Sequence, residues 1–159
     1  MKVILAAALI LAALTCGSAT IEGKVVGVAD GDTITVLDSS NTQHKIRLSG
    51  IDAPEKKQPF GQRSKESLSD LVFDKAVTVE TNKRDKYLRE VGKVLVDGVD
   101  ANLEQIKRGM AWHYKAYEHE QSADDRKVYA EAENEARAAG LGLWSDSVPM
   151  PPWELRHNK

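Results

Sequence analysis

Three short β-prone segments follow one another near the start of the chain, with only tight turns between them. Residues 21–28 are rich in Val, whereas residues 33–37 and 44–48 alternate polar and apolar side chains. An Asp-Gly turn and a Ser-Ser-Asn turn separate the three segments. Connections this short join antiparallel strands, because parallel strands need a crossover of about a dozen residues or more. The pattern therefore predicts an antiparallel meander.

The later segments add helices without a regular alternation of strand and helix. An apolar helical face at 62–73 precedes two further predicted strands, at 76–81 and 91–96, and helices are predicted at 101–108 and 124–139. Parallel α/β folds alternate strand and helix, and this chain does not. We therefore expect a mainly β fold of the α+β class: a five-stranded OB-type β-barrel with three helices.

The first 19 residues differ from the rest of the chain. Lys2 precedes an unbroken apolar run, residues 3–14, and small residues follow it up to Ala19. This is the layout of a secretory signal peptide, and the run is too short to span a bilayer of ~30 Å. We expect cleavage after Ala19, which leaves a secreted or periplasmic protein with no membrane attachment. Lipoprotein anchoring at Cys16 is the alternative.

Removal of residues 1–19 also removes Cys16, the single Cys of the chain. The mature protein then has no disulfide, no thiolate metal site and no Cys nucleophile. The length that remains suits one domain, which we assign to residues 20–146, and a monomer is expected. Three prolines predict that the tail, residues 147–159, is irregular.

The charge of the chain is unevenly distributed. The formal net charge is −2, which argues against a simple, strongly basic nucleic-acid binder. Residues 45–93, however, carry 12 Lys and Arg against 8 Asp and Glu. A basic middle segment between acidic flanks indicates an anionic partner.

Acidic side chains stand at two places where predicted strands begin or end. Asp32 follows the Asp-Gly turn, in which Asp30 is expected to accept a backbone N–H, and Asp52 and Glu55 flank an Ala-Pro pair. Proline stiffens such a loop, so the two acids are held close together. A cation between them or a nearby guanidinium, such as that of Arg47, relieves their repulsion. Divalent cations take carboxylate and carbonyl oxygens as ligands, and a surface acid–base cluster is the alternative.

These motifs resemble those of the staphylococcal nuclease (thermonuclease) family, in the same order and over almost the whole mature chain. The matching stretches are Asp30-Gly31-Asp32-Thr33, Arg47-Leu48, Ile51-Asp52-Ala53-Pro54-Glu55, Asp85-Lys86-Tyr87 with Arg89, Gly109-Met110-Ala111 and Leu143-Trp144-Ser145. The resemblance implies an OB-type barrel and a calcium-dependent endonuclease. Such an enzyme hydrolyses phosphodiester bonds of DNA and RNA and leaves 3′-phosphate ends.

The resemblance also implies roles for the acidic cluster. Asp32, Asp52 and the main-chain carbonyl of Ala53 correspond to the Ca²⁺ ligands. Glu55 corresponds to the carboxylate that positions or deprotonates the attacking water. Oxygen ligands of this kind also suit Mg²⁺, so the residues alone leave the choice between the two cations open.

Two arginines and four further residues correspond to positions that contact the substrate. Arg47 and Arg89 match the phosphate-binding arginines, whose planar guanidinium meets two phosphoryl oxygens at once. Leu88, just before Arg89, replaces a Gly of the family pattern. The residues that match nucleotide-contacting positions are Lys86, Tyr87, Tyr114 and Tyr117. The two tyrosines Tyr114 and Tyr117 either stack on bases or pack on the protein itself.

Two other classes of protein fit part of the pattern. A non-catalytic nucleic-acid-binding OB module would keep the barrel but needs neither the carboxylates nor both arginines. An exported calcium-binding protein would need the carboxylates alone. Because the chain has all of Asp32, Asp52, Glu55, Arg47 and Arg89, we expect a nuclease.

Overall fold

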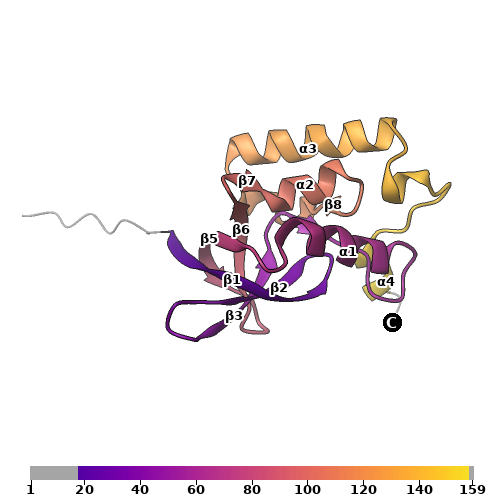
Figure 1. The fold of residues 1–159 in the computed structure, drawn as a ribbon. Coiled ribbons are helices and arrows are strands. Elements are labelled where there is room, and N and C mark those ends of the chain that lie inside the picture. Colours follow the sequence, from indigo (N-terminus) through magenta and orange to yellow (C-terminus); the bar gives the residue numbers. More distant parts are fainter. Residues whose placement is uncertain (1–17, 158–159) are drawn as a thin grey trace, which may run out of the picture.

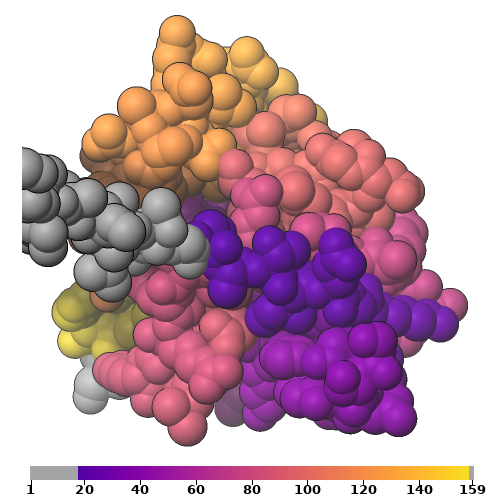
Figure 2. Space-filling view, turned by 90° about the vertical axis from the view of Figure 1, so that its left-hand side faces the viewer, coloured from indigo at the N-terminus to yellow at the C-terminus, as the bar shows by residue number. Residues whose placement is uncertain are grey.

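The computed structural model describes residues 18–157 and contains a β-barrel with helices gathered on one side of it (Figure 1). Most of the predicted signal peptide, together with Cys16, lies outside the described residues. None of the helices within residues 18–157 is long and apolar enough to cross a membrane. In the space-filling view, α3 in orange and the N-terminal strands in indigo and purple form separate parts of the surface (Figure 2).

Five long strands form the barrel. They are β1 (Ala19–Asp30), β2 (Thr33–Leu37), β3 (Gln43–Leu48), β5 (Ala76–Arg84) and β6 (Glu90–Val96). Antiparallel pairing gives the order β3-β2-β1-β5-β6, and parallel pairing of β3 with β6 closes the barrel. The predicted five-stranded barrel and its meander are therefore confirmed.

Three two-residue strands complete the sheet structure. β7 (Val99–Asp100) extends the barrel sheet from β6, whereas β4 (Ile51–Asp52) pairs with β8 (Trp112–His113) in a small separate sheet. In that pair, Asp52 lies opposite Trp112. The β4–β8 pair therefore fixes the backbone of one of the predicted metal ligands.

The three predicted helices are present within a few residues of their expected ends. They are α1 (Gly61–Val72), α2 (Ala101–Lys107) and α3 (Ala123–Ala138), and the 3₁₀ turns η1 (Lys115–Glu120) and η2 (Gly142–Ser145) flank α3. Asp100 caps α2 by accepting the Leu103 N–H at 3.0 Å, and Ser122 caps α3 by accepting the Asp125 N–H at 3.1 Å. Local capping thus sets where α2 and α3 begin.

The core fills the barrel and the layer beneath the helices. Alternate residues of the strands point inward, as the period-two pattern predicts. Fully buried side chains include Val25, Ile34, Val36, Ile46, Leu48, Leu68, Val79, Val94 and Ile106. From α3, the buried Tyr129 donates its hydroxyl to Asp100 at 2.7 Å, which fastens this helix to the barrel.

The C-terminal tail is not irregular throughout, so that prediction was wrong for its last part. Residues Pro152–His157 form a fourth helix, α4. Proline is favoured at the first position of a helix, because it lacks only an N–H that has no partner there, and its φ is already helical. The Trp153 ring stacks on Tyr114, with centroids 5.5 Å apart, and meets the edge of Trp112 at 5.5 Å. Aromatic contacts therefore dock α4 beside β8.

The turn after α2 depends on close contact between the backbone at Gly109 and the backbone at Leu141 and Gly142. Gly109 has φ +67°, and a Cβ there would lie 2.2 Å from the Leu141 carbonyl oxygen. The Leu143 N–H donates to the Gly109 carbonyl at 2.8 Å, so the turn and η2 are joined directly. No side chain fits between these backbones.

Gly109→Ala should lower the free energy of unfolding by roughly 3 kcal/mol, because it adds both a left-handed alanine and a backbone clash. Gly98→Ala is the matched control, since Gly98 also has a positive φ, +78°, but open space around its Cβ position. The control should cost only roughly 1 kcal/mol. Urea denaturation measures both values, and equal losses would contradict the close-contact explanation.

Candidate active site

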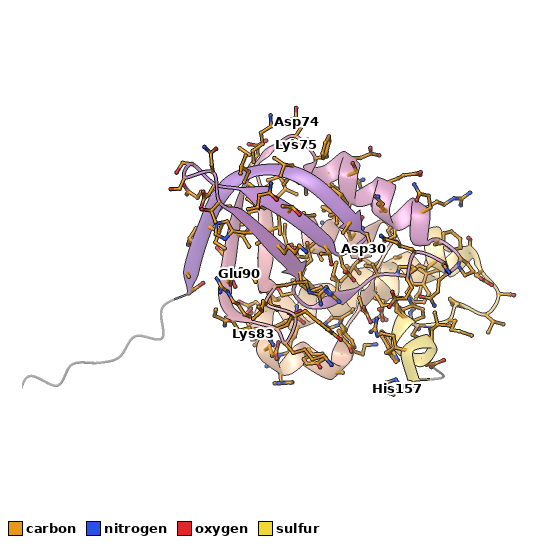
Figure 3. All side chains as sticks on the ribbon, turned by 90° about the horizontal axis from the view of Figure 1, so that it is seen from below. Asp30, Asp74, Lys75, Lys83, Glu90 and His157 are labelled. Carbon is orange, nitrogen blue, oxygen red and sulfur yellow. The ribbon has the colours of Figure 1, made fainter. Side chains whose placement is uncertain are left out.

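Two buried carboxylates lie at the end of the barrel where β1 turns into β2. Asp32 follows that turn and is 6% exposed, and Asp52 on β4 is 1% exposed. Asp32 accepts the Ala53 N–H at 2.8 Å and the Thr33 hydroxyl at 3.0 Å. The side chain of Asp32 therefore links the β1–β2 turn to the loop that carries Asp52. In Figure 3, Asp30 marks the end of β1 on this side.

Arg47 on β3 joins the two carboxylates. Its Nη2 atom lies 3.1 Å from Asp52 Oδ1 and 3.3 Å from Asp32 Oδ2, as expected from the proximity of Arg47 to the acidic loop. The Arg47 side chain is itself largely buried, at 14% exposed. One guanidinium thus contacts both carboxylates in a region of low water access, where opposite charges attract strongly.

The surroundings of these acids shift two carboxyl pKa values upward. Burial and the neighbouring Asp32 carboxylate raise the pKa of Asp30 to about 6. Asp30 also accepts the Asp32 N–H at 3.1 Å, which is the turn role expected for it. Burial raises the pKa of Asp52, against the opposing effect of the guanidiniums of Arg156 and Arg47. Desolvation of closely spaced acids is characteristic of functional sites.

The donor set suits a hard divalent cation. Within residues 18–157, no three or more His, Cys, Asp or Glu side chains gather as a metal cluster. Two carboxylates, Asp32 and Asp52, are available, and Ala53, whose N–H donates to Asp32, carries the backbone carbonyl predicted as the third ligand. All of these are oxygen ligands of the kind that Ca²⁺ and Mg²⁺ take, with water filling the remaining positions. The residues present thus fit such a cation.

Glu55 lies on the loop that follows β4, with its side chain 42% exposed. The loop is compact, because Glu55 N–H donates to the Gln58 side chain at 2.8 Å and Gln58 N–H donates back to the Glu55 carbonyl at 2.8 Å. The carboxylate of Glu55 accepts from Arg156 Nη1 at 2.9 Å. Glu55 therefore shares with Asp52 a partner on the C-terminal helix.

Arg156 is the residue of this site that the sequence analysis missed. It lies on α4, inside the segment predicted to be an irregular tail, and its Nη2 atom is 2.5 Å from Asp52 Oδ2. The available signal was the Pro-Pro-Trp run that begins α4, but nothing in its spacing connects Arg156 with acids about a hundred residues earlier. His157, labelled in Figure 3, marks the end of this helix.

Arg89 reaches the site from the turn between β5 and β6. Its Nη2 atom lies 2.7 Å from Asp85 Oδ2, and its Nη1 donates to the Thr33 hydroxyl at 3.4 Å. Since Thr33 in turn donates to Asp32, Arg89 stands at the edge of the carboxylate cluster. Leu88 has φ +62°, so this position of the turn is left-handed, a conformation that glycine adopts without strain.

The predicted nucleotide-contacting residues fall into two groups. Tyr87 is 67% exposed on the same turn as Arg89, and both the Lys86 ammonium and the Arg89 guanidinium lie over its ring, at 5.1 and 5.4 Å. Tyr114 and Tyr117 lie together, with ring centroids 4.9 Å apart. Tyr117 is 46% exposed, whereas Tyr114 has one face covered by Trp153. Their roles remain predictions.

Comparison with known proteins shows which family the chain resembles. Residues 45–146 match the family described as "Staphylococcal nuclease homologue". A protein of Haemophilus influenzae named "Uncharacterized endonuclease" is 43% identical over 86% of this chain and 73% of its own length. A protein of Escherichia coli O157:H7 with the same name is 45% identical over 89% of this chain and 88% of its own.

A relative with a more specific name spans nearly all of the chain. The "Micrococcal nuclease" of Shigella flexneri is 38% identical over 95% of this chain and 89% of its own length. The family match at residues 45–146 covers the barrel strands β5 and β6 and the helices α1, α2 and α3. Both the sequence match and the fold make this chain a nuclease, a hydrolase of phosphodiester bonds. The chain belongs to the staphylococcal nuclease family.

Proposed function

We propose that this nuclease is calcium-dependent, acts on both DNA and RNA, and leaves 3′-phosphate ends. The observation that carries the proposal is that two buried carboxylates, Asp32 and Asp52, lie close enough together to contact the same guanidinium, that of Arg47. Such a cluster of oxygen ligands is suited to a divalent cation beside an anionic substrate. Residues 20–146 are proposed as the catalytic domain of a monomer.

The residues of the chain have distinct roles in this mechanism. When bound, the cation supplies positive charge that offsets the charge growing on the phosphoryl oxygens. Arg47 and Arg89 hold the phosphate and stabilise the same charge through hydrogen bonds. Glu55, half exposed at the mouth of the cluster, orients a water molecule for attack and accepts its proton. The bond between phosphorus and the 5′ oxygen then breaks. The leaving 5′ oxygen takes a proton from solvent and becomes a 5′-hydroxyl, and the phosphate stays on the 3′ end of the other product.

The substrate-binding surface is proposed to be the turn that carries Lys86 and Tyr87, together with Tyr117. The exposed Tyr87 ring lies beside two cations, and Lys83 lies 5.6 Å from the Tyr117 ring centroid. Aromatic faces near positive charges bind single-stranded nucleic acid with little regard to base or sugar. This chemistry supports action on both DNA and RNA.

Chelation with EDTA should abolish cleavage, and added Ca²⁺ should restore it, because Asp32 and Asp52 need a cation to bring an anionic phosphate close. The assay uses supercoiled plasmid and, separately, single-stranded RNA, with Mg²⁺ in a parallel arm. Products should need phosphatase treatment before a polymerase extends them, which reports 3′-phosphate ends. Undiminished cleavage in EDTA would refute the cation dependence.

Export is proposed from the layout of residues 1–19. Expression of the full chain in a Gram-negative host should yield a shortened protein outside the cytoplasm, beginning at Thr20. Mass spectrometry of the purified protein identifies the first residue. A protein acylated at Cys16 would instead support the lipoprotein alternative.

A further inference from the structure

The C-terminal helix α4 brings a guanidinium onto the same carboxylates that are proposed to hold the cation. Arg156 Nη2 lies 2.5 Å from Asp52 Oδ2, and Arg156 Nη1 lies 2.9 Å from Glu55 Oε1. The other oxygen of Asp52, Oδ1, contacts Arg47 Nη2 at 3.1 Å and Arg156 Nη1 at 3.4 Å. Both oxygens of Asp52 are therefore engaged by arginines.

A divalent cation and Arg156 seek the same oxygens. Asp52 is 1% exposed, so its charge requires a close positive partner. The Arg156 guanidinium meets that requirement, with its fork spanning two carboxylates. A cation that binds Asp52 must share this carboxylate with Arg156 or displace Arg156 from it. Breaking the arginine contact costs free energy, which lowers the apparent affinity of the site for the cation. Glu55 is held by the same guanidinium, so one of its two carboxylate oxygens, Oε1, is occupied as well.

The attachment of α4 to the rest of the molecule is slight. The helix has six residues, of which Pro152 is the one that is buried, and Trp153 contacts Tyr114 and Trp112. The segment before it is exposed, with Val148 at 77% and Met150 at 52%, and the Arg156 side chain is 41% exposed. Few buried contacts hold an element of this kind, so it opens at low free-energy cost.

We propose that α4 is a displaceable latch, whose Arg156 competes with the divalent cation for Asp52 and withholds Glu55 until the cation binds. This inference rests on the proposed cation site at Asp32 and Asp52. Without cation, α4 stays docked and both carboxylates are paired. Cation binding at Asp52 releases Arg156, frees Glu55 and loosens α4.

Isothermal titration of Ca²⁺ into the full chain tests the latch. Arg156→Gln removes the competing charge, and Trp153→Ala removes the docking contacts while keeping that charge. Both should lower the dissociation constant for Ca²⁺ by about tenfold, equivalent to ~1.4 kcal/mol. Arg126→Gln, a change of the same kind on the exposed side of α3, should leave the constant unchanged. Hydrogen exchange of residues 152–157 should accelerate with Ca²⁺ in the wild type and be fast without Ca²⁺ in Arg156→Gln.

Each other outcome counts against a defined part of the proposal. Unchanged Ca²⁺ affinity in Arg156→Gln overturns the latch alone, and weakened affinity shows instead that Arg156 supports the site. Tighter Ca²⁺ binding in Arg156→Gln but not in Trp153→Ala shows that the docking of α4 does not affect Ca²⁺ affinity. This result overturns the proposal that α4 acts as the latch. Absence of Ca²⁺ binding in the wild type and all variants refutes the proposed cation site, and the latch with it.

Discussion

Replacing Glu55 with Gln should lower the rate of phosphodiester cleavage by roughly 10²- to 10⁴-fold, the usual contribution of a general base, and leave the fold intact. Gln keeps the shape of the side chain but accepts no proton from water. Because Glu55 is half exposed and contributes one contact to Arg156, its loss should change thermal stability little. Single-turnover cleavage of a short oligonucleotide measures the chemical step.

The measurement needs saturating Ca²⁺, because Glu55→Gln also weakens the contact of α4 with the site and so alters cation affinity. Glu131→Gln, on the exposed side of α3, is the matched control and should cleave at the wild-type rate. A steep pH dependence in the wild type that disappears in Glu55→Gln would identify Glu55 as the base. Full activity in Glu55→Gln would exclude the assigned role.

Replacing Arg89 with Ala should reduce the cleavage rate by about 10²- to 10³-fold, as expected for loss of one preorganised donor to the developing charge. Asp85 orients the Arg89 guanidinium, because Arg89 Nε and Nη2 lie 2.8 and 2.7 Å from Asp85 Oδ2. The turn thus positions the guanidinium before substrate arrives. Arg89→Lys should recover only part of the rate, because an ammonium cannot meet two phosphoryl oxygens in a plane.

Arg84→Ala is the control for the loss of positive charge on this part of the barrel. Arg84 lies at the end of β5, is largely exposed and pairs with Glu90. Its removal should weaken substrate binding slightly and leave the chemical step unchanged. Equal losses of the single-turnover rate in Arg84→Ala and Arg89→Ala would show that Arg89 contributes only long-range attraction.

The barrel was predictable because its signals are local. Each signal determines the structure of only a few neighbouring residues. The signals are the alternating side chains of the strands, the Asp-Gly turn and the helix caps Asp100 and Ser122, and all of them are consistent with the same fold. The two-residue strands were not predictable, because two residues are too few to show an alternation of polar and apolar side chains. The pairing of Ile51 with His113 forms only when the rest of the fold brings the two segments together.

The candidate site was only partly accessible from the sequence. The proximity of Arg47 to Asp52 follows from their five-residue spacing across a strand end, and the structure confirms it. Arg89 contacts Thr33 across 56 residues, and only the family resemblance indicated that Arg89 belongs to the site. The contact of Arg156 with Asp52 spans 104 residues and lies outside the motifs of that resemblance, so no sequence signal pointed to it.

The parallel pairing of β3 with β6 also governs when the chain becomes an enzyme as it folds. Hairpins such as β1–β2–β3 form from neighbouring residues within microseconds, whereas a pairing between distant strands must first close a long loop. Arg47 lies opposite Val91 in that pairing, and Arg89 immediately precedes β6. A chain that has formed only the β1–β2–β3 hairpins therefore has Asp32 and Arg47 in place, but neither Asp52 on β4 nor the second arginine. The β3–β6 pairing is therefore needed before Arg47 and Arg89 lie at one site, and a chain that lacks this pairing should have no nuclease activity.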